Sequence, residues 1–182
     1  MRVNSNDPTS RQTGLLVSYL MRTPNIYIFG GMLKHIVCPV AHPNFTDIDL
    51  IAIDVAELDR IRDAFAYVFR ELPRIGTGPR YFIGKSKQSA KPIQLVLMRC
   101  HRHAMQFVIE GPQYDIDRAA YCNGQFYFDP AIGEEAIRAA ITAKRATRRN
   151  GHRNMTHFAP HRQQIEQRHR LKLMRKGFAI ID

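Results

Sequence analysis

Two adjoining patterns near the N-terminus constrain the fold of this chain more than any other feature: an apolar strand that ends in two glycines, and a later strand that carries two aspartates. The run Ile26–Phe29 has no polar residue, which predicts a buried strand. Gly30 and Gly31 end it, and a helix is expected to open directly after them. The stretch Thr46–Ile53 predicts the next strand.

The two aspartates of the second strand, Asp47 and Asp49, are two residues apart and therefore point to one face. Two carboxylates on one face offer the hard oxygen ligands that Mg²⁺ prefers, usually together with substrate phosphates. The glycine pair lets backbone approach a ligand closely, and N–H groups at the start of a helix favour an anion. Phosphoryl transfer uses both kinds of site.

The remaining pattern predicts one mixed sheet with helices around it, an α/β or α+β fold. Asp54 is expected to cap a helix that starts near Glu57 and runs to Leu72. Asn123 and Gly124 are expected to form a hairpin turn. The other predicted elements are a helix over Gly14–Met21, strands over Tyr81–Ile83, Ile93–Met98, Met105–Ile109, Tyr114–Tyr121 and Gln125–Phe128, and a helix over Ala131–Ala146.

Positive charge is concentrated near the C-terminus. The net charge is +11, and the stretch from Lys144 to Lys176 contains eleven of the 27 Lys and Arg residues but a single acid, Glu166. Such a field attracts polyanions, and phosphate backbones are the commonest partner. We therefore divide the chain into a catalytic domain, 1–143, and a basic, mainly helical segment, 144–182, whose candidate nucleic-acid contacts are Arg145, Arg148, Arg149, Arg168, Arg170 and Lys172.

Within the basic segment, Ile165, Leu171 and Met174 are spaced so that one side of a helix packs on the domain, and Phe178 is expected to anchor the end of the chain. No stretch approaches the roughly 20 apolar residues that cross a bilayer, and the polar N-terminus lacks a secretory signal. A cytoplasmic protein without a membrane partner is the expectation. The 3 cysteines favour reduced thiols over a disulfide framework.

The residues Ile28-Phe29-Gly30-Gly31 followed by Asp47-Ile48-Asp49-Leu50 resemble the signature of the polymerase-β-type nucleotidyltransferase superfamily. That superfamily has a glycine pair that opens a helix and an Asp-x-Asp on the next strand, and it includes tRNA CCA-adding enzymes, poly(A) polymerases and small toxin-type enzymes. The resemblance covers residues 26–54 and extends to about 128 through a third acid. It implies a nucleotidyltransferase-like palm. The short chain also resembles, more loosely, compact members from phages and mobile elements.

The resemblance implies a third carboxylate on a later strand beside the first pair. Tyr114-Asp115-Ile116-Asp117 offers two candidates on one face, of which Asp115 is preferred because it follows the aromatic residue, with Asp117 in reserve. The structural alternative for these acids is an ion pair with an arginine such as Arg118.

The implied reaction is the transfer of a nucleotide from a nucleoside triphosphate such as ATP to a hydroxyl, with release of pyrophosphate. Asp47 and Asp49 are expected to hold two Mg²⁺ (or Mn²⁺) ions, and Asp115 the ion that activates the hydroxyl. Gly30 and Gly31 are expected beside the triphosphate. Lys34, one turn into the helix, is a candidate to reach a phosphate.

The leading hypothesis is therefore an enzyme that adds nucleotides to a nucleic-acid end, with the 3′ end of RNA as the expected acceptor. Two alternatives stay open. One is a non-catalytic nucleic-acid-binding module whose acids are structural. The other is a toxin-type nucleotidyltransferase that modifies a protein or a small molecule.

Overall fold

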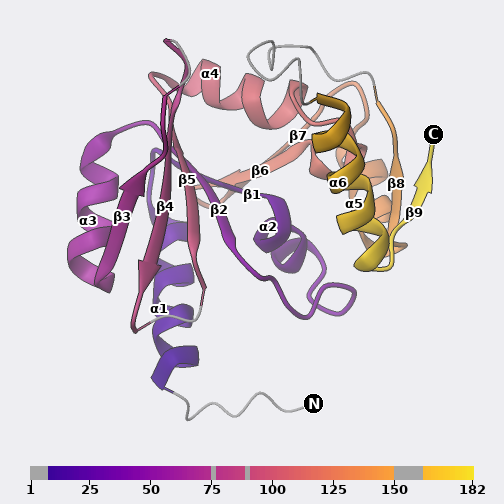
Figure 1. The fold of residues 1–182 in the computed structure, drawn as a ribbon. Coiled ribbons are helices and arrows are strands. Elements are labelled where there is room, and N and C mark those ends of the chain that lie inside the picture. Colours follow the sequence, from indigo (N-terminus) through magenta and orange to yellow (C-terminus); the bar gives the residue numbers. More distant parts are fainter. Residues whose placement is uncertain (1–7, 75–76, 89–90, 150–161) are drawn as a thin grey trace.

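A seven-stranded mixed sheet with helices packed around it forms the body of the protein (Figure 1). The computed structural model describes residues 8–74, 77–88, 91–149 and 162–182. The sheet has the order β3-β4-β5-β2-β1-β6-β7. Its strands are β1 (Ile26–Phe29), β2 (Ile48–Ala52), β3 (Tyr67–Glu71), β4 (Arg80–Ser86), β5 (Ile93–Leu97), β6 (Ala119–Cys122) and β7 (Gln125–Phe128).

The helices differ in length and type. The α-helices are α1 (Pro8–Arg22), α2 (Gly30–Val37), α3 (Val55–Phe65), α4 (His101–Met105), α5 (Glu134–Thr142) and α6 (Arg162–Arg175). A π-helical turn, η1 (Gln106–Glu110), continues α4, and a short 3-10 helix, η2 (Asp115–Asp117), precedes β6. The predicted fold class, a mixed sheet flanked by helices, is confirmed.

The sheet has two differently covered faces, and the alternation of side chains along β2 shows both. Ile48, Leu50 and Ala52 point into the large core, to which α1, α2, α3 and α5 contribute. Ile51 points to the other face, into a smaller core under α4 and η1. Asp49 has the parity of Ile51 and therefore lies on the face with the smaller core.

Strand pairing places the second aspartate of the predicted pair beside the end of β1. β1 and β2 are antiparallel, and Asp49 is in register with Phe29, the residue before the glycine pair. On its other side β2 runs parallel to β5, where Asp49 is in register with Gln94. The short β1–α2 connection and these two ladders fix the aspartate against the start of α2.

Two local predictions are confirmed. The Asp54 side chain caps α3 by accepting a hydrogen bond from the Ala56 N–H, as expected of an N-cap aspartate. Asn123 and Gly124 connect β6 to β7 with φ values of 44° and 84°, the left-handed pair that a two-residue hairpin requires.

The helix predicted from Glu57 to Leu72 is wrong in its second half. α3 ends at Phe65, Ala66 takes a left-handed conformation with φ 51°, and β3 follows at once. The hydrophobic spacing of this stretch fits a helix, but the aromatic and β-branched residues after Ala66 pair with β4 along the whole of β3. Tertiary pairing therefore outweighs the local pattern.

The predicted strand over Met105–Ile109 is also wrong, because α4 and η1 occupy it. The strand predicted over Tyr114–Tyr121 begins only at Ala119. Before it, the Asp115 carboxylate accepts a hydrogen bond from the next backbone N–H, that of Ile116, at 2.7 Å. Short polar side chains that bond nearby backbone in this way favour turns over strands.

The described parts of the basic segment, residues 144–149 and 162–182, pack onto the body. The short strands β8 (Arg145–Thr147) and β9 (Ala179–Ile181), which precede and follow α6 in the sequence, pair in parallel. Helix α6 lies beside this pair of strands (Figure 1). Phe178 is 4% exposed and stacks on His42 with ring centroids 5.2 Å apart, which confirms its predicted role as an anchor.

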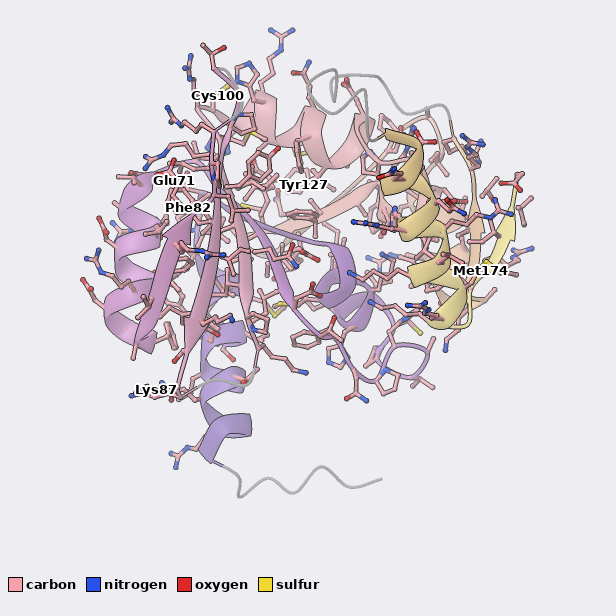
Figure 2. The ribbon with its side chains drawn as sticks, in the orientation of Figure 1. Glu71, Phe82, Lys87, Cys100, Tyr127 and Met174 are labelled. Atoms are coloured by element: carbon pink, nitrogen blue, oxygen red, sulfur yellow. The ribbon has the colours of Figure 1, made fainter. Side chains whose placement is uncertain are left out.

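The side of α6 that packs is not the predicted one. Leu173 is buried, whereas Leu171 and Met174 are exposed (Met174 is labelled in Figure 2). The side chain of Ile165 lies outside the described residues. Across the described parts of the chain, no helix combines the length and the apolar character that crossing a bilayer takes.

We predict that Phe178→Ala lowers the free energy of unfolding by about 3 kcal/mol, because it removes a buried ring and leaves a cavity beside His42. Urea denaturation followed by circular dichroism measures the loss. Met174→Ala, at an exposed position on α6, is the control and is expected to stay within about 0.5 kcal/mol. Equal losses in the two variants would contradict the anchoring role.

Candidate active site

The carboxylate pair, Asp47 and Asp49, lies where β2 begins. Asp47 directly precedes the strand and is 9% exposed. Its Oδ1 accepts a hydrogen bond from the Thr46 hydroxyl at 2.9 Å, and its Oδ2 accepts one from Gln94 Nε2 at 2.7 Å. The Gln94 amide on β5 therefore sets the orientation of the first carboxylate.

The second carboxylate rests on the glycine pair. Gly30 has φ +67°, a conformation that disfavours any side chain, and a Cβ at this position would collide with Asp49 Oδ2. The backbone N–H of Gly31 donates a hydrogen bond to the Asp49 carboxylate. The expected proximity of the glycine pair to the aspartates is thus what the structure shows, and it explains why glycine is needed at position 30.

The two negative charges are close enough to disturb each other. Burial, and then the neighbouring charge of Asp47, raise the pKa of Asp49 from 3.8 to about 6, although Lys172, the Gly31 N–H and Lys34 act in the opposite direction. The positive groups present thus compensate the pair only in part.

Two lysines at the C-terminal end of α6 lie near this pair, Lys172 on the helix and Lys176 directly after it. Lys172 Nζ lies 3.8 Å from Asp47 Oδ2, although the Lys172 side chain is 52% exposed. Lys176 is half-buried, and its Nζ lies 3.7 Å from where a Cβ on Gly31 would be. Burial, followed by the charges of Lys172 and Lys34, lowers the pKa of Lys176. Sequence reasoning assigned Lys172 to nucleic-acid contact and missed Lys176; their i, i+4 spacing was the available signal.

Lys34 is engaged within the protein. It is 6% exposed and pairs with Asp117 Oδ1, and the His169 Nε2 of α6 lies 3.2 Å from the other oxygen of the same carboxylate. Burial alone would raise the pKa of Asp117, but the Lys34 ammonium and the His169 imidazole hold it well below its usual range. Asp117 is therefore an ionised structural partner that links α2 to α6.

Asp115 is engaged by hydrogen bonds from the backbone. It is 4% exposed, and its Oδ1 accepts from the backbone N–H groups of Ile116 at 2.7 Å and Thr147 at 3.0 Å. In the described part of the chain, no three His, Cys, Asp or Glu side chains gather as a metal ion would require. The predicted convergence of Asp115 with the carboxylate pair is thus not seen.

The strand beside β2 carries an amide where the resemblance implies an acid. The residue in register with Asp49 on β5 is Gln94, which hydrogen-bonds Asp47. Sequence reasoning missed Gln94 because it sought a carboxylate. The expected ion pair of Arg118 with Asp115 or Asp117 is also corrected, since Arg118 Nη1 binds Asp129 Oδ2 at 2.9 Å.

The carboxylate pair fits a divalent cation by its chemistry. Mg²⁺ is commonly held by one or two carboxylates, with substrate phosphates and water completing its shell. Asp47 and Asp49 supply hard oxygen donors, and burial together with the charge of Asp47 raises the pKa of Asp49. A divalent cation is the group that such a pair attracts.

The arginines assigned to nucleic-acid contact lie outside the pair. Arg145, Arg149 and Arg168 are exposed. Arg148 is half-exposed near Glu166, with 3.5 Å between Nη2 and Oε2, and Arg170 pairs with Asp182. They form an outer basic surface on β8 and α6.

A cavity of about 470 Å³ lies on the same sheet face as Asp49 but at the other end of β2. Ile53, four residues after Asp49 and roughly 13 Å farther along the strand, forms part of its wall. Tyr81, Phe107 and Arg99 also line it. The cavity is thus separate from the carboxylate pair, although both lie on the same face of the sheet.

Comparison with known proteins gives structural matches only. No family model matches the chain, and no curated protein matches it. A CCA-adding enzyme in complex with CTP matches with a TM-score of 0.56 at 12% identity, over 97% of this chain and 44% of that one. The complex of a CCA-adding enzyme with ATP matches with a TM-score of 0.55 at 13% identity, over 100% of this chain and 44% of that one.

These matches define the fold as a nucleotidyltransferase-like mixed sheet flanked by helices. An apo form of the CCA-adding enzyme gives a TM-score of 0.53 at 13% identity, over 99% of this chain and 43% of that one. The chain spans less than half the length of the CCA-adding enzymes it matches.

We predict that Asp49→Asn stabilises the protein at about pH 7.5 without metal, by roughly 1–2 kcal/mol. The folded-state pKa of Asp49 lies above the unfolded value, so the folded protein binds the extra proton between 3.8 and about 6 and loses stability as the pH rises through that window. Asparagine removes this loss.

Thermal melts in EDTA measure the effect, which is expected to be a rise of roughly 2–6 °C at about pH 7.5 and little change at about pH 4. A destabilised variant at the higher pH would show that the Asp49 charge is fully compensated in the free protein.

Proposed function

We propose that this protein is a metal-dependent nucleotidyltransferase that transfers a nucleotide from a nucleoside triphosphate to a hydroxyl. The observation that carries the proposal is the contact between the Asp49 carboxylate and the glycine pair at the start of α2, with Asp47 beside it. A divalent cation bound by the pair would lie next to backbone suited to a triphosphate. The matched fold belongs to enzymes seen with CTP and with ATP.

Each residue has a defined role in this proposal. Asp47 and Asp49 would hold Mg²⁺ or Mn²⁺, which when bound would neutralise charge on the transferring phosphate and favour ionisation of the attacking hydroxyl. Gln94 orients Asp47 through its 2.7 Å hydrogen bond. Gly30 and Gly31 bring backbone close to the triphosphate. Asp115, which binds the backbone of β8, is a positioning residue in place of the metal ligand expected from the sequence.

In the reaction, the hydroxyl oxygen forms a bond to the α-phosphorus as the bond to the bridging oxygen of the pyrophosphate breaks. The pyrophosphate leaves with the bonding electrons, and the hydroxyl proton passes to water. The chain itself supplies position and charge, because phosphoryl transfer asks little covalent chemistry of a protein.

RNA is the acceptor that the basic surface favours. The exposed arginines on β8 and α6 belong to the same structural unit that brings lysines to the carboxylate pair. In this proposal an RNA backbone binds along these arginines and its end enters the site. Nucleic-acid binding through phosphates is salt-dependent and independent of sequence.

Two observations favour a second function: β5 carries an amide, Gln94, in register with Asp49, and Lys172 lies near Asp47. A nucleic-acid-binding module without catalytic activity would tolerate both features. The two functions differ in whether the carboxylates are needed for chemistry.

We predict that Asp47→Asn and Asp49→Asn each lower pyrophosphate release from labelled triphosphates by roughly 100-fold or more, because each removes a ligand of the divalent cation. The assay uses Mg²⁺ or Mn²⁺ with RNA, DNA and protein acceptors. Asp59→Asn is the matched control, since Asp59 is an exposed acid on α3 that pairs with Arg62. Wild-type protein that releases no pyrophosphate with any acceptor, yet binds RNA, would favour the binding module.

We also predict that the double variant Arg148→Gln/Arg149→Gln binds RNA more weakly and lowers the slope of log K against log salt by about 1–2, because two phosphate contacts are lost. Fluorescence anisotropy at several salt concentrations measures both. Arg22→Gln/Arg70→Gln removes the same charge from exposed positions elsewhere. If activity stays unchanged while RNA affinity falls, the acceptor is a protein or a small molecule instead.

A further inference from the structure

Two cations at the C-terminal end of α6, one on the helix and one directly after its last residue, lie at the edge of the candidate site. Lys172 Nζ lies 3.8 Å from Asp47 Oδ2. Lys176 Nζ lies 3.7 Å from where a Cβ on Gly31 would stand. The backbone N–H of Lys176 donates to the Lys172 carbonyl at 3.2 Å, so the two lysines lie one turn apart at the end of the helix. We call Lys172 and Lys176 the α6 lysines.

The third nearby lysine is already paired. Lys34 binds Asp117, whose second oxygen lies 3.2 Å from His169 Nε2. Lys34 therefore acts on Asp49 through its charge alone, whereas Lys172 lies beside Asp47 and Lys176 lies beside Gly31. Two positive charges thus oppose two negative charges in the free protein.

An ammonium and a divalent cation compete for the same carboxylate oxygens. A divalent cation carries twice the charge of an ammonium and binds carboxylate oxygens directly, so it can displace a partly exposed lysine. Its affinity is reduced by the attraction between that lysine and the carboxylates. Lysine has a flexible four-carbon side chain and three donors, and it binds phosphate as a point charge. A displaced lysine next to Gly31 therefore has a phosphate within reach if a triphosphate enters with the metal.

We propose that the α6 lysines partly offset the charge of the carboxylate pair in the free protein and pass to the β- and γ-phosphates when a metal-bound triphosphate enters. This inference rests on the proposed function, because it assigns the phosphate-binding groups of that same site. It makes α6 a part of the nucleotide site. It also makes the binding of metal and of polyphosphate cooperative, since each ligand relieves a charge that the other leaves unbalanced.

Opposite changes in two affinities distinguish this role from a structural one. Removing the α6 lysines removes the cations that compete with metal, so affinity for metal alone rises. The same change removes phosphate partners, so affinity for polyphosphate alone falls. A variant that merely loosened α6 would weaken both.

The test measures Mn²⁺ alone and inorganic tripolyphosphate alone, each by isothermal titration calorimetry, on the full chain and its Lys172→Met/Lys176→Met variant. We expect Mn²⁺ to bind roughly three- to tenfold more tightly and tripolyphosphate at least about tenfold more weakly. Arg175→Met removes a charge from the same helical turn at an exposed position and is expected to change both by less than about twofold.

Mn²⁺ affinity that is unchanged or lower in the double variant overturns the inference, as does tripolyphosphate affinity that stays unchanged. Equal effects in Arg175→Met also overturn it, because they would reflect net charge alone. A thermal melt of each variant shows whether α6 stays docked. Where the double variant melts lower, Lys172→Met alone, at the more exposed position, must still change the two affinities in opposite directions.

Failure of the proposed function gives a different result. If the double variant shows the two opposite affinity changes but the wild-type protein transfers no nucleotide, the assigned binding site stands and the proposed reaction is wrong. If the wild-type protein transfers nucleotides but the double variant lacks the opposite affinity changes, the proposed reaction stands and the role of the α6 lysines is wrong.

Discussion

The close approach of Asp47 and Asp49 is the interaction on which the rest of the site depends. Burial, and then the charge of Asp47, raise the pKa of Asp49 to about 6, and the nearby donors and cations offset this only in part. The offsets come from several elements: the Gly31 N–H at the start of α2, the Gln94 amide on β5 and a lysine on α6. Strained electrostatics of this kind are typical of functional sites, where a ligand supplies the missing charge.

The parts of this site that the sequence predicted are those fixed by neighbours in the chain. The strand Ile26–Phe29 ends at the predicted glycine, because left-handed backbone at Gly30 is a local property. Asp49 lies on the face opposite Leu50, as the period of a strand requires. Asp54 caps α3 through a hydrogen bond that spans two residues. Each of these features can be derived within a short window of sequence.

The parts that the sequence did not predict depend on contacts between distant residues. Lys34 and Asp117 are 83 residues apart in the chain, and no local pattern indicates that they pair. Gln94 matters only because β5 lies parallel to β2 in one register. Asp115 looked like a strand carboxylate by its spacing, but it binds the backbone of Thr147, which belongs to the C-terminal segment. Tertiary hydrogen bonds, not propensity, decided these positions.

The same reasoning changes how the positive charge of the C-terminal segment is understood. From its composition alone, the C-terminal segment is a basic tail that attracts polyanions through its total positive charge. Burial of Leu173 on α6 and of Phe178 after it instead fixes one face of the helix on the body. The basic side chains therefore face either the candidate site or the solvent. Lys172 and Lys176 turn toward the carboxylates, while Arg148 and Arg149 stay at the surface. Packing of one helix on the body thus places lysines near the carboxylates and leaves arginines exposed, where they can bind a polyanion.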